Sequence, residues 1–298
     1  MAEFSSIGVI GRPSHDGAAQ SLRRLLAFLD SRDCAVIFDE ATAGLIESRG
    51  RPAVPVEQLA GHCDLVVVVG GDGSLLHAAQ HIAEVPVIGV NRGRLGFLTD
   101  VLPDEIESRL GDVLAGKYLR ERRFLLEAEV RRGGPDEPVE PAGRALNDVV
   151  LHPGKFAQMI AFELFIDGQF VYSQESDGLI VATPTGSTAY ALSAGGPIMH
   201  PRLDALVLAP LNPHSLTSRP LVVDGNSEVR LVVGAKDERE PQLSCDGRVR
   251  RYSFRAGDEI LVRKHANFLT LIHPPDYTSY QACRSKLGWG SRFARADD

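Results

Sequence analysis

The sequence has little that would tie the chain to a membrane, to nucleic acid or to an oxidising compartment. It contains four cysteines in 298 residues, scattered and without a CxxC pair, so we expect reduced thiols in a cytoplasmic protein. No apolar run approaches the roughly 20 residues of a membrane helix. The first residues lack the basic and apolar regions of a signal peptide, so none is expected. With a formal net charge of −7, the chain has no global basic field for nucleic acid or an anionic membrane.

The first 120 residues alternate between strand-like and helical patterns. Strand-like apolar stretches lie at 6–11, 34–38, 65–69 and 85–91. Stretches with helical spacing of apolar residues lie at 18–30, 74–83 and 103–116. Such alternation predicts a doubly wound α/β domain with a parallel sheet. The unbroken run of valines from Val66 to Val69 is typical of a strand buried on both faces.

The pattern changes after residue 120 to many short strands separated by turns. A polar, proline-rich stretch at 133–143 predicts a loop, and Asp246-Gly247 is one of several turn signals. The predicted strands are 122–132, 145–152, 159–167, 169–174, 177–183, 205–210, 228–234, 242–247, 250–254, 259–264 and 267–273. Close spacing of this kind predicts an antiparallel all-β sandwich.

We therefore predict two domains and a tail. Residues 1–120 form the α/β domain, and residues 121–275 form the all-β domain. Residues 276–298 form a partly helical C-terminal tail that packs back on the N-terminal domain.

The segment Gly70-Gly71-Asp72-Gly73 joins the valine strand to the next helical pattern. A strand, a glycine turn and a helix N-terminus often bind phosphate through backbone N–H groups. A carboxylate there has two chemical uses: it can hold a divalent metal, or it can accept a proton from a hydroxyl being phosphorylated. The alternative is a tight turn in which Asp72 caps the following helix. The segment lacks the Gly-Lys-Ser/Thr ending of a Walker A loop and the third glycine of GxGxxG, which disfavours a hydride-transferring enzyme.

Two further segments offer polar groups in a glycine-rich setting. In 177–201, hydroxyl side chains stand where a helix is predicted to begin, and Tyr190 could stack on a base. In 146–154, Asn147 and Asp148 stand side by side at a strand start and suit ribose hydroxyls or a base edge. Taken singly, each also fits an ordinary helix start or turn.

Together these three segments resemble the NAD kinase family. The family has a GGDG loop, an Asn-Glu pair before a strand, and a TPTGSTAY segment leading into Gly-Gly-Pro. In this sequence they stand as Gly70–Gly73, Asn147-Asp148, Thr183–Tyr190 and Gly195–Pro197. Similar segments also lie at 91–100 and 213–223, and the resemblance extends from about residue 7 to about residue 275.

The resemblance implies that the protein transfers the γ-phosphate of ATP to the 2′-hydroxyl of the adenosine ribose of NAD, giving NADP. It implies Asp72 as the general base, and a divalent metal, Mg²⁺ or Mn²⁺, that arrives with ATP rather than in a protein cage. It also implies NAD and ATP as substrates and a homodimer or homotetramer. Two alternatives stay open: another GGDG-loop kinase acting on a lipid or sugar, and a module that senses NAD(P) without catalysis.

By the same resemblance a set of side chains would contact NAD. Asp177 would read its nicotinamide half, and 188–193 would wrap the adenosine. The full set is Asp72, Gly73, His77, Asn147, Asp148, Glu175, Asp177, Thr188, Ala189, Tyr190, Ala191, Leu192, Ser193 and Arg248.

Four of these residues depart from the family pattern. Asp148 replaces the usual Glu and is one methylene shorter. His77 stands where many relatives carry Arg, Glu175 stands where some bacterial relatives carry Arg, and Arg248 stands where some carry Gln. His77 and His81 share a helical face, but their spacing is not HExxH, and we predict no metal-ligating residues in the chain.

Overall fold

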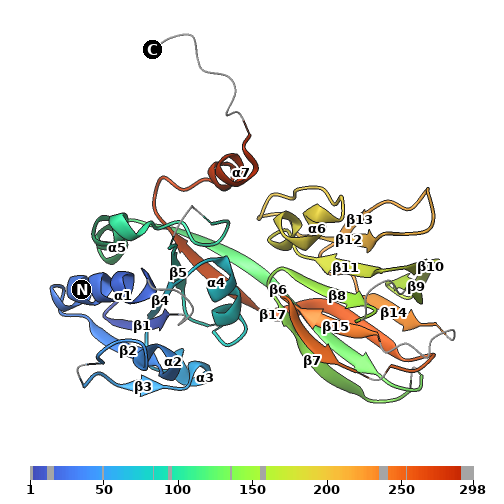
Figure 1. Cartoon of the computed structure of the whole chain (residues 1–298), viewed down its shortest axis with the longest axis horizontal. Coiled ribbons are helices and arrows are strands. Elements are labelled where there is room, and N and C mark those ends of the chain that lie inside the picture. Colours follow the sequence, from blue (N-terminus) through green and yellow to red (C-terminus); the bar gives the residue numbers. More distant parts are fainter. Residues whose placement is uncertain are drawn as a thin grey trace, which may run out of the picture. The chain divides into compact units, whose positions relative to one another are not determined.

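The computed structural model describes residues 3–11, 17–48, 50–82, 84–92, 96–134, 136–154, 159–234, 241–252 and 254–289 (Figure 1). The backbone divides into two compact units. The first, here called the N-terminal unit, comprises Met1–Arg122 and Leu269–Asp298. The second, here called the β-unit, comprises Arg123–Phe268.

A parallel sheet forms the centre of the N-terminal unit. Its strand order is β5-β4-β1-β2-β3, and the last part of β17 pairs in parallel with β5. The strands are β1 (Ser6–Gly11), β2 (Ala35–Asp39), β3 (Ala53–Val54), β4 (Leu65–Val69), β5 (Val87–Val90) and β17 (Glu259–His273). A short parallel bridge also joins Val90 to Val101.

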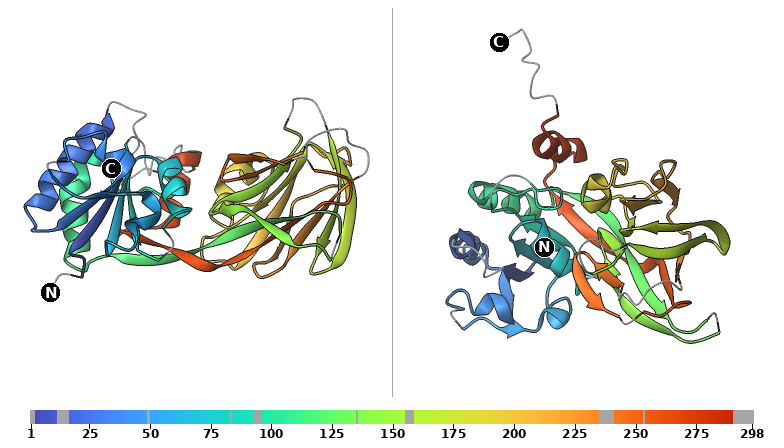
Figure 2. Two further views of the ribbon diagram at one scale, coloured as in Figure 1. Left: turned by 90° about the horizontal axis from the view of Figure 1, so that it is seen from below. Right: turned by 45° about the vertical axis from the view of Figure 1, so that its right-hand side comes forward.

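Helices follow the strands of this unit and cover its sheet (Figure 2). They are α1 (Gly17–Asp30), α2 (Glu40–Ala43), α3 (Val56–Leu59), α4 (Asp72–Ala79), η1 (Pro103–Glu105) and α5 (Ile106–Leu114). A further helix, α7 (Ser279–Leu287), follows β17 in the chain and stands apart from the sheet in Figure 1. Leu65, Val67 and Val69 of β4 point into a core shared with α1 and α5. Because side chains alternate along a strand, Val66 and Val68 point to the opposite face, and both are fully buried. A sheet buried on both faces explains the unbroken valine run.

The β-unit contains two antiparallel sheets in its described residues. One has the order β13-β12-β11-β8-β15-β16. Its strands are β8 (Asp148–His152), β11 (Gly178–Ala182), β12 (Ala205–Leu211), β13 (Leu221–Asp224), β15 (Gln242–Cys245) and β16 (Arg248–Arg251). In the other, β10 (Gln169–Ser176), β9 (Ile160–Ile166) and β14 (Val229–Val233) lead to β17, and β6 (Leu119–Arg131) pairs with β17 and with β7 (Val139–Ala145).

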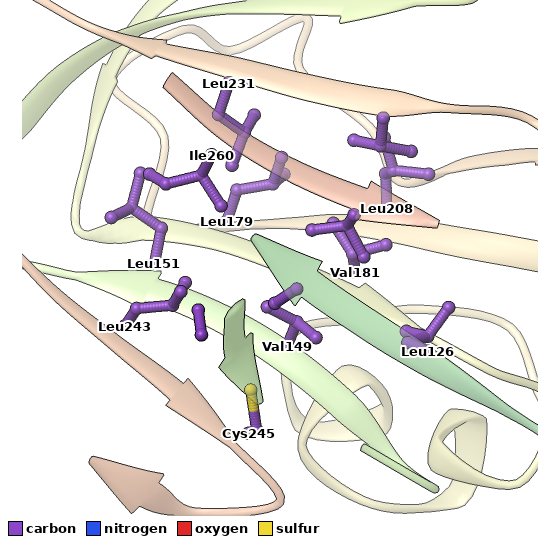
Figure 3. Packing of buried hydrophobic residues seen from close by; sticks show 14 of the residues in the cluster. Leu126, Val149, Leu151, Leu179, Val181, Leu208, Leu231, Leu243, Cys245 and Ile260 are labelled. Carbon is purple, nitrogen blue, oxygen red and sulfur yellow. The ribbon is translucent and has the colours of Figure 1, made fainter. Parts of the chain in front are cut away.

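The main core of the β-unit is made by inward-facing residues from both sheets (Figure 3). Val149 and Leu151 of β8, for example, pack in one cluster with Leu231 and Ile260. The alternate residues of the first sheet, among them Val150 and Ile180, form a second cluster on its outer face. A short segment with η2 (Gly186–Thr188) and α6 (Tyr190–Ser193) contributes Ala191 to that second cluster.

The predicted order of an α/β domain followed by an antiparallel β domain is confirmed, while several local predictions are wrong. The predicted loop at 133–143 contains the start of β7, which pairs with β6 and carries Pro141 next to a register shift. An edge strand tolerates proline because its free side needs no N–H donor. The two strands predicted at 259–264 and 267–273 are the single strand β17. The helix predicted from Ser74 begins instead at Asp72.

The tail contains α7, whose Thr278 side chain caps the helix N-terminus. Arg109 of α5 forms an ion pair with Asp276 at 2.8 Å, and Ala282 and Cys283 are buried. The remainder of the predicted tail, 290–298, lies outside the described residues. Within the described chain, no helix is both long enough and apolar enough to cross a membrane.

Candidate active site

The glycine turn after β4 opens directly into α4. Gly71 is the N-cap, and Asp72 lies in the first helical turn, where a carboxylate interacts favourably with the helix dipole. A Cβ on Gly70 would lie 2.2 Å from Ser74 Oγ, so this glycine is needed for close packing. A Cβ on Gly71 or Gly73 would meet no heavy atom of the described residues within 4 Å. The space at the Cβ positions of the two glycines that flank Asp72 is therefore free of other described residues.

The Asp72 carboxylate is held by a segment 25 to 27 residues further along the chain. Its Oδ2 accepts from the backbone N–H of Phe97 at 2.9 Å. Its Oδ1 accepts from the N–H of Leu98 at 3.1 Å and from the Thr99 hydroxyl at 3.0 Å. A Cβ on Gly96 would lie in contact with Asp72 Oδ1 at 2.1 Å, so the arrangement requires glycine there. The carboxylate binds these neighbours rather than the N–H groups of its own helix, so the capping interpretation of Asp72 is wrong.

His77 lies further along α4 and is half-buried. Its ring meets the ring of His81 edge to face, with centroids 5.3 Å apart. His81 Nδ1 lies 3.3 Å from a carboxylate oxygen of Glu57. No group of three or more His, Cys, Asp or Glu side chains among the described residues is placed to hold a metal ion.

A pocket of about 560 Å³ lies in the β-unit, within the size range of small-molecule sites. Its floor is the outer face of the first sheet, and its walls come from strand ends and from the start of α6. The floor residues are Asp148, Val150, His152, Ser244, Asp246 and Val249. The wall residues are Asn147, Pro153, Asp177, Ala189, Tyr190, Leu211, Asn212 and Gly247.

Asp246 fixes one end of this pocket. It lies in a tight turn between β15 and β16, with φ of 49° at Asp246 and 72° at Gly247. Its carboxylate accepts from the backbone N–H groups of Leu146 at 2.9 Å and Asn147 at 2.8 Å. The sequence identified this pair only as a turn, yet its carboxylate holds the start of β8 from 99 residues away.

The segment 183–199 is tied to the same strand start. Thr183 Oγ1 donates to the Leu146 carbonyl at 2.6 Å and accepts from Gly186 N–H at 3.2 Å. Ser187 Oγ accepts from Met199 N–H at 2.9 Å, which closes the glycine-rich loop on itself. The hydroxyls of this segment therefore tie it to the start of β8 and close it on itself, and its residues Ala189 and Tyr190 line the pocket.

The structure brings five of the predicted NAD-contacting residues to the pocket lining: Asn147, Asp148, Asp177, Ala189 and Tyr190. Tyr190 is half-exposed, and the Asp177 carboxylate accepts from Asn212 Nδ2 at 2.8 Å. Asp72, Gly73 and His77 belong to the N-terminal unit.

Six predicted residues of the β-unit are not in the lining described for this pocket. Ala191 is fully buried in the outer-face cluster, and Thr188 Oγ1 donates to the Thr185 carbonyl at 3.2 Å. The full set is Glu175, Thr188, Ala191, Leu192, Ser193 and Arg248.

Several lining residues were missed in the sequence. Asn212 is one of them, and so are His152, Ser244 and Val249. Strand alternation beyond Asp148 would have pointed to His152, whereas strand pairing places Ser244 and Val249, and Asn212 follows the end of β12.

Comparison with known proteins decides the family. The model of the ATP-NAD kinase N-terminal domain matches residues 7–118, and that of the C-terminal domain matches residues 146–273. The NAD kinase of Alcanivorax borkumensis is 58% identical over 292 residues, which cover 97% of this chain and 96% of the relative. That of Azotobacter vinelandii is 56% identical over 98% of this chain and 99% of its own length. The chain belongs to the ATP-NAD kinase family.

Solved structures of this kinase family share the fold. A yeast NADH kinase complexed with NADH superimposes with a TM-score of 0.85 at 26% identity, covering 99% of this chain and 93% of that one. An NAD kinase from Archaeoglobus fulgidus in complex with ATP gives a TM-score of 0.72 at 27% identity, covering 95% and 97%. The protein is thus an enzyme, a kinase of the ATP-NAD family.

In this kinase Asp148 has an unusual environment. Its side chain is buried, and burial together with the nearby Asp246 carboxylate raises the pKa of Asp148 to about 7. Asp148 therefore does not simply carry a negative charge. Near neutral pH Asp148 is divided between its protonated and ionised forms.

The raised pKa predicts how stability depends on pH. In the unfolded chain Asp148 ionises near pH 4 (roughly 3.9 for an unperturbed Asp), whereas in the folded protein it keeps its proton until about pH 7. Its contribution to stability is therefore fully present below pH 4 and is lost as the pH rises to 7. The loss is on the order of a few kcal/mol, because one pKa unit corresponds to about 1.4 kcal/mol.

Asp148→Asn removes this titration, so the variant should gain stability relative to the wild type between pH 5 and pH 8. Urea unfolding of both proteins at half-unit pH steps measures the difference. If the free energies of unfolding of the two proteins, plotted against pH, stay parallel across this range, the raised pKa of Asp148 is contradicted.

Proposed function

We propose that Asp72 is the general base with which this NAD kinase transfers the γ-phosphate of ATP to the 2′-hydroxyl of the adenosine ribose of NAD. The observation that carries the proposal is the Asp72 carboxylate, which 97–99 hold in place and which two glycines with free space at their Cβ positions flank. A carboxylate has about four lone-pair positions, and three accept hydrogen bonds from 97–99. Oδ2 keeps capacity to accept one further proton donor, the ribose hydroxyl.

In the proposed step the O2′–H bond breaks and its proton passes to Asp72 as O2′ forms a bond to the γ-phosphorus. The bond between the γ-phosphorus and the bridging oxygen breaks, and ADP leaves. An Asp is a weak base for an alcohol, so it orients the hydroxyl first and takes the proton as the new bond develops. The first-turn N–H groups of α4 face the anionic phosphates in this scheme.

Magnesium or manganese enters as the metal complex of ATP. The donors around Asp72 are N–H and O–H groups, which suit a carboxylate and not a cation. This agrees with a metal held mainly by substrate phosphates and water.

NAD binding is assigned to the pocket of the β-unit. Asn147, Asp148 and Asp177 offer polar groups there, and Tyr190 offers a half-exposed ring. A contribution from the predicted residues outside the lining, Thr188, Glu175 and Arg248 among them, remains part of the proposal. Two solved relatives, the yeast enzyme in complex with NADH and the Archaeoglobus fulgidus enzyme in complex with ATP, support both substrates.

We also propose that the enzyme works in the cytoplasm as a homodimer or homotetramer. All four cysteines are free thiols, which suits a reducing compartment. Leu216 and Val222 expose large apolar side chains on the β-unit, Leu216 to 93%, and a second copy of the chain could cover them. Light scattering coupled to gel filtration measures the assembly.

The test is formation of NADP from NAD and ATP with Mg²⁺, detected with an NADP-specific dehydrogenase. Phosphorus NMR of the product identifies the 2′-phosphate. Chelation of the metal should abolish turnover, and added Mg²⁺ should restore it. Parallel reactions with polyphosphate or NADH define donor and acceptor. Folded protein that binds NAD but forms no NADP would contradict the proposal and favour a sensing role.

A further inference from the structure

The pocket floor of the β-unit carries a row of side chains that the proposed NAD contacts leave unexplained. Ser244 of β15 pairs with Val150 of β8 on one side and with Val249 of β16 on the other. His152 follows two residues after Val150, so it projects from the same face of the sheet. All four residues line the pocket. The floor thus combines two apolar side chains with one hydroxyl and one imidazole.

The imidazole of His152 has a defined hydrogen-bonding role. Its Nδ1 accepts from the backbone N–H of Gly154 at 3.3 Å, so this nitrogen carries no proton. Burial lowers the pKa of His152, which keeps the ring neutral at neutral pH. A neutral ring has its proton on the other nitrogen, so Nε2–H is a donor. Among the described residues, no acceptor is found for this donor.

Ser244 provides a second polar group on the same floor. The residue is only 6% exposed and lines the pocket, and its Oγ is not one of the fully buried unpaired side-chain atoms of the described chain. A hydroxyl can both donate and accept a hydrogen bond. A group on a pocket floor can find its partner in a bound molecule.

We propose that His152 and Ser244 form a base-recognition subsite in this pocket. An aromatic base of NAD lies on the methyl groups of Val150 and Val249. A hydrogen-bond acceptor on its edge, a ring nitrogen of adenine or the carboxamide oxygen of nicotinamide, takes the His152 Nε2–H, and the Ser244 hydroxyl bonds beside it. The subsite rests on the proposed function for the identity of its ligand. It makes His152 and Ser244 determinants of NAD affinity rather than of the chemical step.

The first test separates binding from chemistry. His152→Leu and Ser244→Ala should each raise KM and Kd for NAD about 3- to 10-fold, the effect of one lost hydrogen bond, and leave kcat unchanged. His152→Gln should restore most of the affinity, because its terminal amide places an N–H near the position of Nε2. His200 is a matched control: its Nδ1 accepts from the N–H of Arg202 at 3.2 Å in the same local pattern, but it is not in the pocket lining. His200→Leu should bind NAD like the wild type.

The second test identifies the acceptor. NAD analogues with a deaza-adenine lack one ring-nitrogen acceptor, and the thionicotinamide analogue has a weak one in place of the carboxamide oxygen. The analogue that lacks the acceptor of His152 should have the same Kd for the wild type and for His152→Leu. That analogue identifies whether His152 contacts the adenine or the nicotinamide edge.

Two results would overturn the subsite. One is an unchanged Kd for NAD in folded His152→Leu. The other is a loss of affinity in His152→Leu that persists with every analogue and that His152→Gln does not relieve. Calorimetry measures NAD binding without ATP, so it tests the subsite independently of phosphate transfer. The proposed function fails only if the wild type forms no NADP.

Discussion

Asp72→Asn lowers kcat for NADP formation by roughly 10²- to 10⁴-fold, the usual contribution of a general base, while Kd for NAD changes little. Asn has the size of Asp but cannot accept the hydroxyl proton. Its amide nitrogen also faces N–H donors from 97–99 instead of accepting from them. Single-turnover kinetics with saturating ATP measure the chemical step, and calorimetry measures NAD binding.

Gly96→Ala tests the same site without removing the carboxylate. The new Cβ would lie 2.1 Å from Asp72 Oδ1 and 2.4 Å from Thr99 Oγ1, so Asp72 must turn away from its donors. We expect a smaller loss of kcat than for Asp72→Asn and a similar Kd for NAD. Turnover of Asp72→Asn within tenfold of the wild type would exclude Asp72 as the base, although the kinase activity itself would stand.

Gly186→Ala lowers the free energy of unfolding by about 1–3 kcal/mol, the range for a forced clash in a packed interior, and weakens NAD binding. A Cβ on Gly186 would lie 2.1 Å from the carbonyl oxygen of Asn147 and 2.5 Å from its carbonyl carbon. Both contacts are with backbone, so no side-chain rotation relieves them. The start of β8 must move, and with it Asn147 and Asp148 on the pocket.

Denaturant unfolding and NAD titration measure the two effects of Gly186→Ala. Gly61→Ala is the matched control, because its Cβ would meet only the Gln58 carbonyl oxygen, at an ordinary 3.5 Å. Wild-type stability and affinity in Gly186→Ala would show that the strand start tolerates displacement and that our account of the TPTG segment is wrong.

The sequence by itself determined those features of the fold that depend only on residues close together in the chain. The valine run of β4 and the helical spacing of α1 indicated the α/β class. A strand buried on both faces has a continuous apolar run, whereas a helix buried on one face has apolar residues at every third or fourth position. Asp246-Gly247 was identified as a turn because both residues adopt positive φ, which this pair tolerates. The GGDG segment was recognised as a strand-to-helix connection by its glycines and by the patterns on either side.

Tertiary structure alone decided which groups meet. Nothing near Asp72 in the sequence indicates that Phe97, Leu98 and Thr99 hold its carboxylate. Residues 139–143, at the end of the proline-rich stretch, are strand and not loop because pairing with β6 outweighs their low strand propensity. Likewise Ser244 meets Val150 only because β15 lies beside β8. Periodicity and turn preference act over a few residues, whereas strand order and side-chain pairing join segments far apart in the chain, and the candidate site is built from such pairings.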